Sequence, residues 1–302
     1  MPNILSTHIL APAKINLFLK ILAEEKSGYH QLETLYATVD FGDEIVLSRT
    51  TGSGTRGVAL EVVGPSPCPA EENLAYRAAT ALLDRVGSRE GVHLRLTKNI
   101  PVGAGLGGGS SDAGATLRAL NTLLGEPVSG SVLLELAGQL GADVPFFASG
   151  AGMALAWGRG ERLLPLPGTA GLAILLALPP LHIATAEAYQ DLKVADRVAP
   201  TTLALDELGR RDTLAKLAMN DFEAGVFERH PELGALRGAI QEAGALTARL
   251  SGSGSGLFGL FNDQATADHA RDSLSRSWAD VRFVRTETAL FQPAPSLSPS
   301  DP

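Results

Sequence analysis

The sequence predicts an α+β protein with two domains, on the basis of its length and of the order of its strand and helix patterns. The chain has 302 residues, 45% of them hydrophobic, which is enough for two separate cores. Its second half follows the order β-α-β-β-α-β, with extra helices in the first crossover, and this order is typical of a ferredoxin-like split βαβ domain. We place the boundary near Pro167 and Gly168, so that the domains span residues 1–167 and 168–291. Residues 292–302 are rich in proline and serine, and we expect this tail to be disordered.

Composition and charge favour a protein that acts on a small molecule. The formal net charge is -8, the isoelectric point is about 5.3 and lysine and arginine form no cluster, so neither a nucleic acid nor a membrane is the expected partner. The single cysteine, Cys68, cannot form an internal disulfide, and residues 1–10 lack the pattern of a secretory signal. The longest apolar run, Leu172–Leu178, stops at two prolines and is too short to span a bilayer. We therefore expect a cytoplasmic protein, with this run as a buried strand.

The first half begins with a strand that carries two polar side chains on one face. From Ala13 to Ile21 the odd positions are apolar, which predicts a half-buried strand with Lys14 and Asn16 on its other face, about 7 Å apart. A lysine on such a face is either solvated or directed at a ligand, and the strand pattern fits both. The turn Gly28-Tyr29-His30 follows and displays an aromatic ring and an imidazole together.

Further strands and helices complete the first half. Alternating patterns predict strands over residues 44–48 and 58–63, joined as a long hairpin by the Gly/Ser-rich segment 50–57. An apolar period predicts a helix over residues 73–86, and a second helix over residues 131–140 ends at a glycine.

The segment Lys98–Asp112 has the composition of an anion-binding loop. Five glycines in seven positions, residues 103–109, free the backbone and let a ligand approach it closely. The segment follows an alternating strand pattern, Val92–Leu96, and leads into a helix that we expect a serine to cap. Free N–H groups and the helix dipole both favour phosphate at such a place. A flexible linker is the alternative, but a linker does not need the amphipathic helix that follows directly.

Two common nucleotide-binding motifs fit this segment poorly. A P-loop requires lysine directly after its last glycine, where this chain has Ser110, so a P-loop is excluded. Gly103, Gly105 and Gly108 satisfy G-x-G-x-x-G, but the next helix does not lead to a strand that ends in an acidic residue, as a dinucleotide-binding fold requires. A phosphate-binding loop of another type is the interpretation that we keep.

Two later features are consistent with a site around this loop. Asp143 lies in an apolar stretch that runs into Phe146 and Phe147, where an unpaired carboxylate is costly. It is either a helix-capping or turn residue or a partly buried base held by a cation. A second glycine loop, Ser251–Gly256, separates the two middle strands of the second domain. An ordinary hairpin turn needs two or three residues, so a loop of six implies that another part of the molecule packs against it.

The sequence shows no metal-binding pattern. Its six histidines are scattered along the chain, and it contains neither H-E-x-x-H nor paired cysteines. We therefore expect any metal ion to arrive with a nucleotide. A G-x-S-x-G motif, which would place a nucleophilic serine on a sharp turn, is absent as well.

Residues 101–111 closely resemble the phosphate loop of the GHMP kinases, the superfamily of galactokinase, homoserine kinase and mevalonate kinase. Residues 12–17 with Gly28-Tyr29-His30, and residues 140–145, resemble the branch that phosphorylates the 2-hydroxyl group of 4-diphosphocytidyl-2-C-methyl-D-erythritol on the methylerythritol phosphate route to isoprenoid precursors. The second glycine loop is similar to the third motif of the superfamily, and the resemblance covers about Leu10 to Phe261. It implies an ATP-dependent kinase with Mg²⁺, an N-terminal domain of the ribosomal-protein-S5-domain-2-like type and a ferredoxin-like C-terminal domain.

The resemblance also implies roles by matching position. Asp143 would be the general base on the 2-hydroxyl group, and Lys14 the cation that keeps it ionised; a backbone cradle, one base and one cation are sufficient for phosphoryl transfer. The residues implied to bind ATP are Asn73, Lys98, Pro101, Val102, Gly103, Ala104, Gly105, Leu106, Gly107, Gly108, Gly109, Ser110 and Ser111, with Ser111 as the candidate Mg²⁺ contact. Those implied to bind the cytidyl substrate are Asn16, Tyr29, His30, Thr185 and Tyr189.

Two alternatives of different classes stand beside this reading. One is another small-molecule kinase of the same superfamily, against which Tyr29-His30 and the strand that carries Lys14 and Asn16 argue. The other is a non-catalytic, nucleotide-binding regulator descended from such a kinase, for which loss of the base or the cation would be the sign. Lys14 and Asp143 are both present.

Overall fold

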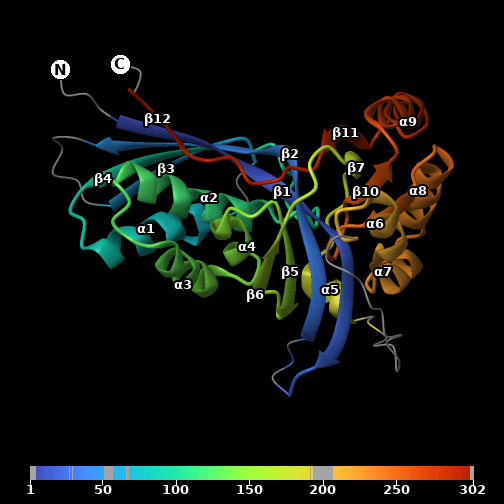
Figure 1. Ribbon diagram of the computed structural model, residues 1–302, viewed down its shortest axis with the longest axis horizontal. Helices are drawn as coiled ribbons and strands as arrows, with labels where there is room; N and C mark the ends of the chain where they lie inside the picture. Colours follow the sequence, from blue (N-terminus) through green and yellow to red (C-terminus); the bar gives the residue numbers. More distant parts are fainter. Residues whose placement is uncertain are drawn as a thin grey trace.

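Two β-sheets, each covered by helices, organise the chain (Figure 1). The computed structural model describes residues 5–26, 28, 30–50, 57–65, 68–190, 192 and 207–299. The prediction of an α+β fold is confirmed, and most predicted elements occur within a few residues of their expected bounds. None of the helices in these ranges is long and apolar enough to cross a membrane.

The elements have the following bounds. The strands are β1 Leu5–Glu24, β2 His30–Thr50, β3 Gly57–Val63, β4 Gly91–Thr97, β5 Met153–Gly158, β6 Arg162–Leu166, β7 Ala173–Leu178, β8 Met219–Asn220, β9 Thr247–Leu250, β10 Leu257–Phe261, β11 Arg282–Glu287 and β12 Ser296–Pro299. The helices are α1 Leu74–Val86, α2 Gly108–Leu123, α3 Gly130–Leu140, α4 Val144–Ser149, α5 Thr185–Gln190, α6 Arg211–Leu217, α7 Glu223–Arg229, α8 Pro231–Glu242 and α9 Gln264–Ser277, with a 3-10 turn at Ala70–Glu72.

The first sheet has eight strands, ordered β12-β1-β2-β4-β3, with β5 and β8 added beside β2 and β1 and β6 beside β5. Strands β1 and β2 form a long antiparallel hairpin whose closed end extends out of this sheet and passes between the two halves of the molecule (Figure 1). Helices α1, α2 and α3 lie together on one side of the sheet, and their alanine and leucine side chains form a core with the strands. The odd positions of the predicted strand, from Ala13 to Ile21, are buried as expected.

The predicted hairpin between residues 44–48 and 58–63 is wrong. Strands β2 and β3 do not pair; β4 lies between them, antiparallel to β2 and parallel to β3. Parallel neighbours need a long crossover, and α1 supplies it between β3 and β4. Alternation identifies a strand but not its neighbour, so the sequence pattern does not show which strands pair.

The second sheet has four antiparallel strands in the order β11-β7-β10-β9. This is the strand order of a ferredoxin-like split βαβ domain, so that prediction is confirmed. Strand β7 is buried along its whole length, as its apolar run predicts. The predicted helical stretch from Ala186 to Arg229 contains α5, α6 and α7 but is interrupted by the short strand β8, and part of it lies outside the described residues.

A third apolar cluster joins the two sheets. Ile15 and Leu17 of β1 pack there with Ile174 and Leu176 of β7 and with Phe258 of β10. The chain also returns to the first sheet twice, because β8 pairs with β1 in parallel and β12 pairs with β1 antiparallel. The two halves are thus closely packed, and the division at residue 167 stays a prediction.

The tail predicted to be disordered is ordered as far as residue 299. Strand β12 extends the first sheet, and Gln292 is buried, with its side-chain amide donating to the carbonyls of Phe146 at 3.0 Å and Ala151 at 2.9 Å. Arg118 of α2 donates to the carbonyl of Pro293 at 2.8 Å. These specific hydrogen bonds hold a proline- and serine-rich segment in place, which composition alone does not show.

Candidate active site

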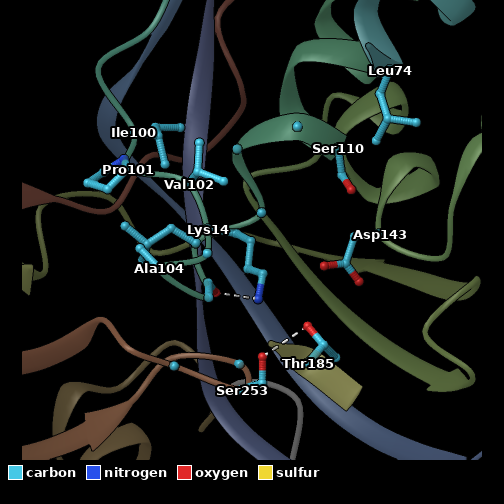
Figure 2. A pocket seen from close by; sticks show the side chains of 18 of the residues that line it. Lys14, Leu74, Ile100, Pro101, Val102, Ala104, Ser110, Asp143, Thr185 and Ser253 are labelled. Atoms are coloured by element: carbon cyan, nitrogen blue, oxygen red, sulfur yellow. Dashed lines mark hydrogen bonds between the residues drawn. The ribbon is translucent and has the colours of Figure 1, made fainter. Parts of the chain in front are cut away.

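A cavity of about 540 Å³ lies where the two glycine loops meet, at the junction of the sheets. Figure 2 shows Lys14 and Asp143 directed into the same space, with Ser110 on one side and Ser253 and Thr185 on the other. Of the residues expected to bind ATP, all but Ser111 line this cavity. The sequence-predicted loop, base and cation therefore come together, although they are far apart along the chain.

The first glycine loop passes directly into α2 without a serine cap. The helix begins at Gly108, and its N-cap is Gly107, with φ +71° and no side-chain hydrogen bond, so the predicted serine cap is wrong. Ser111 is fully buried and its hydroxyl donates to the carbonyl of Pro12 at 2.7 Å, which keeps it away from the cavity. Ser110 lines the cavity instead. The first N–H groups of α2 thus have no side-chain cap, which suits them to an anion.

The second glycine loop packs backbone to backbone against the first. Ser255 and Gly256 donate their N–H groups to the carbonyls of Gly103 and Ala104, each at 3.1 Å. A Cβ atom on Gly105, which has φ +68°, would lie 1.9 Å from the carbonyl oxygen of Ser251, so only glycine fits there. The expectation that this loop of six residues packs against another part of the molecule is confirmed.

Lys14 lines the cavity and is only 4% exposed. The alternative in which this lysine lies on a solvated face of the strand is therefore wrong. Its ammonium donates to Asn16 Oδ1 at 2.6 Å and to the carbonyl of Gly105 at 2.9 Å. The amide of Asn16, in turn, donates to Thr34 Oγ1 at 2.8 Å, which fixes its orientation. Burial lowers the pKa of Lys14, and the negative charge of Asp143 opposes that change. The positive charge is therefore held by neutral dipoles on one side and faces the cavity.

Asp143 precedes α4 but does not cap it, because its side chain makes no capping hydrogen bond. Instead Oδ1 accepts a hydrogen bond from the hydroxyl of Tyr36 at 2.8 Å. Tyr36 is buried on β2, and burial, followed by the charge of Asp143, raises the pKa of its phenol well above the usual value. The local sequence is consistent with Asp143 as either a helix-capping residue or a general base, and this geometry favours a general base.

Lys98 also lines the cavity, but its charge is neutralised inside the protein. Its ammonium donates to Asp43 and, at 2.6 Å, to Asp112 of α2. Asp43 is fully buried and its other oxygen accepts from the N–H groups of Asn99 and Ile100, at the entry to the glycine loop. Burial acts to lower the pKa of Lys98, yet the two carboxylates together raise it. For Asp112, burial dominates and raises the pKa to about 8.

A second cavity, of about 1000 Å³, adjoins the first between the β1–β2 hairpin and the turn that joins β5 to β6. The rings of His30 and Tyr189 stack there with centroids 4.6 Å apart, and Tyr189 meets Phe222 edge to face. Thr185 lines both cavities, and its hydroxyl lies 3.2 Å from that of Ser253. Tyr29 lies outside the described residues. His30, Thr185 and Tyr189 thus gather at one end of the site, whereas Asn16, the other predicted substrate residue that is described, lines the first cavity beside Lys14.

Sequence reasoning missed several residues of this site. Tyr36 and Asp43 carry no motif, because each acts through a contact distant in sequence, and Asp112 lies within the segment of the glycine loop but was given no role. Residues 252–254 of the second loop also line the first cavity. Their glycine-rich composition was a signal, but no binding role was assigned to them.

Among the described residues, no cluster of three or more histidine, cysteine, aspartate or glutamate side chains would hold a metal ion. The nearby side chain that offers an oxygen at the start of α2 is that of Ser110.

Comparison with known proteins places the chain in a family. The family model "GHMP kinases N terminal domain" matches residues 73–151, and "GHMP kinases C terminal" matches residues 204–280. The chain is 40% identical over 264 residues to 4-diphosphocytidyl-2-C-methyl-D-erythritol kinase of Solibacter usitatus. This match covers 85% of this chain and 82% of that protein. It is also 40% identical over 311 residues to the enzyme of that name from a Synechococcus strain, with 97% and 98% coverage.

Solved structures agree with the sequence comparison. A crystal structure of 4-(cytidine 5'-diphospho)-2C-methyl-D-erythritol kinase superposes with a TM-score of 0.78 at 36% identity, covering 93% of this chain and 99% of that one. A homoserine kinase from Cytophaga hutchinsonii superposes with a TM-score of 0.73 at 20% identity, which shows a common fold. The chain belongs to the family of the 4-diphosphocytidyl-2-C-methyl-D-erythritol kinases, within the GHMP kinases.

Proposed function

We propose that this protein transfers the γ-phosphoryl group of ATP to the 2-hydroxyl group of 4-diphosphocytidyl-2-C-methyl-D-erythritol, a step on the methylerythritol phosphate route to isoprenoid precursors. The observation that carries the proposal is identity of 36–40% to enzymes of this name along nearly the whole chain. The geometry supports it, because Lys14 and Asp143 face one cavity beside a glycine loop that opens a helix.

Asp143 is the general base in this proposal. Its carboxylate takes the proton of the 2-hydroxyl group while that oxygen forms a bond to the γ-phosphorus, and the bond from phosphorus to the β,γ-bridging oxygen breaks, with its electron pair leaving on ADP. Lys14 stabilises the charge that develops on the transferred group. The hydrogen bonds of its ammonium to Asn16 and Gly105 fix its position before the reaction.

The first glycine loop and the start of α2 hold the triphosphate. The uncapped N–H groups at the helix start and the helix dipole both favour negative charge there. Asn73 and Lys98 border the adenosine end, although the Asn73 side chain also caps α1 by accepting from the N–H of Ala75 at 2.9 Å. Mg²⁺ supplies neutralisation of phosphate charge when bound, and we assign its protein contact to Ser110, since Ser111 faces away.

The cytidyl group occupies the end of the site near His30, Thr185 and Tyr189, with Tyr29 expected beside them. The rings of His30 and Tyr189 already stack on each other, so there is no room for the cytosine ring between them. Cytosine must therefore either lie beside the two rings or separate them. Binding energy from this remote group aligns the 2-hydroxyl group with Asp143.

The test is to incubate the pure protein with ATP, Mg²⁺ and the cytidyl substrate and to follow ADP release. Turnover that depends on the cytidyl substrate supports the proposal, and homoserine and mevalonate serve as control acceptors. Faster turnover of either control would favour another GHMP kinase, and binding of ATP without turnover of any acceptor would favour a regulator.

A further inference from the structure

The base of the proposed reaction has a hydrogen-bond donor that the proposal does not use. Tyr36 is only 2% exposed, and its hydroxyl donates to Asp143 Oδ1 at 2.8 Å. The ammonium of Lys14 lies 5.6 Å from the centre of the same ring. No hydrogen bond or ion pair joins Lys14 directly to Asp143 among the described residues, so the phenol is the side chain that contacts both members of the pair.

The surroundings leave Tyr36 little freedom. Its ring packs on that of Phe146, with centroids 5.0 Å apart, at the start of α4. Gly160, in the turn between β5 and β6, lies so close that a Cβ atom there would be 3.0 Å from the hydroxyl oxygen and 3.6 Å from Asp143 Oδ1. The hydroxyl is thus confined against the carboxylate by the ring on one side and by the turn on the other.

We propose that Tyr36 is a positioning residue for the general base: its hydroxyl holds Oδ1 of Asp143, so that Oδ2 is the oxygen that receives the proton of the 2-hydroxyl group. This inference depends on the proposed function, because it assigns the base oxygen of that reaction. A hydrogen bond from a phenol to a carboxylate stabilises the charged form, which is the form that accepts a proton. The hydroxyl therefore bears on both the orientation and the charge of the base.

Other charged or titratable groups near the carboxylate come from different elements, and one of them, Arg159, lines the same cavity and pairs with Glu25 at 2.6 Å. Lys14 faces it from β1, Tyr189 from α5 and Glu161 from the β5–β6 turn, since each shares an electrostatic interaction with Asp143 or with Tyr36 beside it. A change confined to the hydroxyl of Tyr36 leaves all of these groups in place. A shift of the pH profile after that change would therefore be due to the lost hydrogen bond.

The experiment compares Tyr36→Phe with Tyr76→Phe. The first variant keeps the ring against Phe146 and removes the one hydroxyl, so the fold is preserved; the second removes a hydroxyl from α1, outside the cavity lining. We expect kcat of Tyr36→Phe to fall roughly tenfold to a hundredfold, the usual worth of a hydrogen bond to a charged group. The acidic limb of the kcat profile should move to higher pH, while KM for ATP and the profile of Tyr76→Phe stay unchanged.

Three outcomes would overturn the inference. Normal kcat with an unchanged acidic limb would mean that Tyr36 does not act on Asp143. A lower melting temperature with an unchanged profile would show a purely structural role. If the wild-type protein itself does not turn over the cytidyl substrate, the proposed function fails and the assignment of the base oxygen fails with it, which the wild-type assay distinguishes from the first two results.

Discussion

Two lysines line the same cavity, Lys14 buried inside the protein and Lys98 with a side chain 10% exposed, and their hydrogen-bond partners differ in charge. Lys14 is held by neutral oxygens, those of Asn16 and Gly105, and burial lowers its pKa. Lys98 is held by the carboxylates of Asp43 and Asp112, which raise its pKa. The charge of Lys14 is not neutralised by a directly paired carboxylate and can act on a ligand or on Asp143. The charge of Lys98 is neutralised by carboxylates of the protein itself.

This difference in partners predicts that one lysine contributes mainly to catalysis and the other mainly to the stability of the fold. A buried cation held by dipoles costs the fold free energy, and its charge can act on a reacting group. A buried cation held by carboxylates joins parts of the fold, here the entry of the glycine loop at Asn99 and Ile100 to helix α2. We therefore expect loss of Lys14 to affect chemistry first, and loss of Lys98 to affect stability first.

The largest effect is expected for Lys14→Met. In the proposed mechanism the ammonium stabilises charge in the transition state and supports Asp143, so kcat should fall by roughly 10²–10⁴. Thermal melting should change less than in the Lys98 variant described next, because the hydrogen-bond partners of Lys14 are neutral and its removal breaks no ion pair. Steady-state kinetics with melting curves measure both; near-normal turnover would show that Lys14 is only a core residue.

For Lys98→Met the order is reversed. Removing the ammonium leaves the fully buried carboxylate of Asp43 without its cation, which costs about 3–5 kcal/mol of stability. Urea unfolding measures the loss. The folded fraction should retain kcat within a few-fold, with the defect in KM for ATP, because the glycine loop loses its anchor. A loss of kcat as large as that of Lys14→Met, with intact stability, would contradict the comparison.

Asp112→Asn tests the ion cluster around Lys98 through the pH dependence of protein stability. The ordinary pKa of this carboxyl is 3.8, and burial raises it to about 8 in the fold. Between these values the folded state binds a proton that the unfolded state does not, so this group makes stability fall as pH rises toward 8. Asparagine resembles the protonated acid, and the stability of the variant relative to the wild type should increase from pH 5 to pH 8. Parallel stability curves would refute the raised pKa.

The smallest effect is expected for Ser251→Ala. The hydroxyl donates at 3.0 Å to the carbonyl of Gly105, the same oxygen that accepts from Lys14. That oxygen keeps its second donor in the variant, so the loss should be about 1 kcal/mol in stability and less than tenfold in kcat. A larger loss of kcat would mean that the loop contact, rather than the ammonium, controls the site.

Residues in local motifs could be predicted from the sequence. The first glycine loop, Lys14 and Asp143 each stand in a short pattern, and the structure brings all three to one cavity. The strand order of the second sheet was predictable too, since its β-α-β-β-α-β succession has few solutions. In each case the information lies within a few neighbouring residues or in the order of elements.

Residues that act across long separations could not be predicted. Tyr36 and Asp143 are 107 positions apart, and Asp43 and Lys98 are 55 apart, so no spacing links them. The position of β4 between β2 and β3 is likewise determined by tertiary packing. The helix α1 between β3 and β4 was nevertheless a signal for a parallel crossover. Gln292 shows the same limit, because its two hydrogen bonds depend on carbonyls more than a hundred positions away.

The most direct test of the account is a double-mutant cycle on Lys14 and Asp143. Single-turnover rates would be measured for the wild type, Lys14→Met, Asp143→Asn and the double variant, with the cytidyl substrate and saturating ATP. In the proposed mechanism the two side chains act as a unit, so the double variant should be about as slow as the slower single variant. Rate losses that multiply in the double variant would show that the two residues work independently and would contradict the pairing.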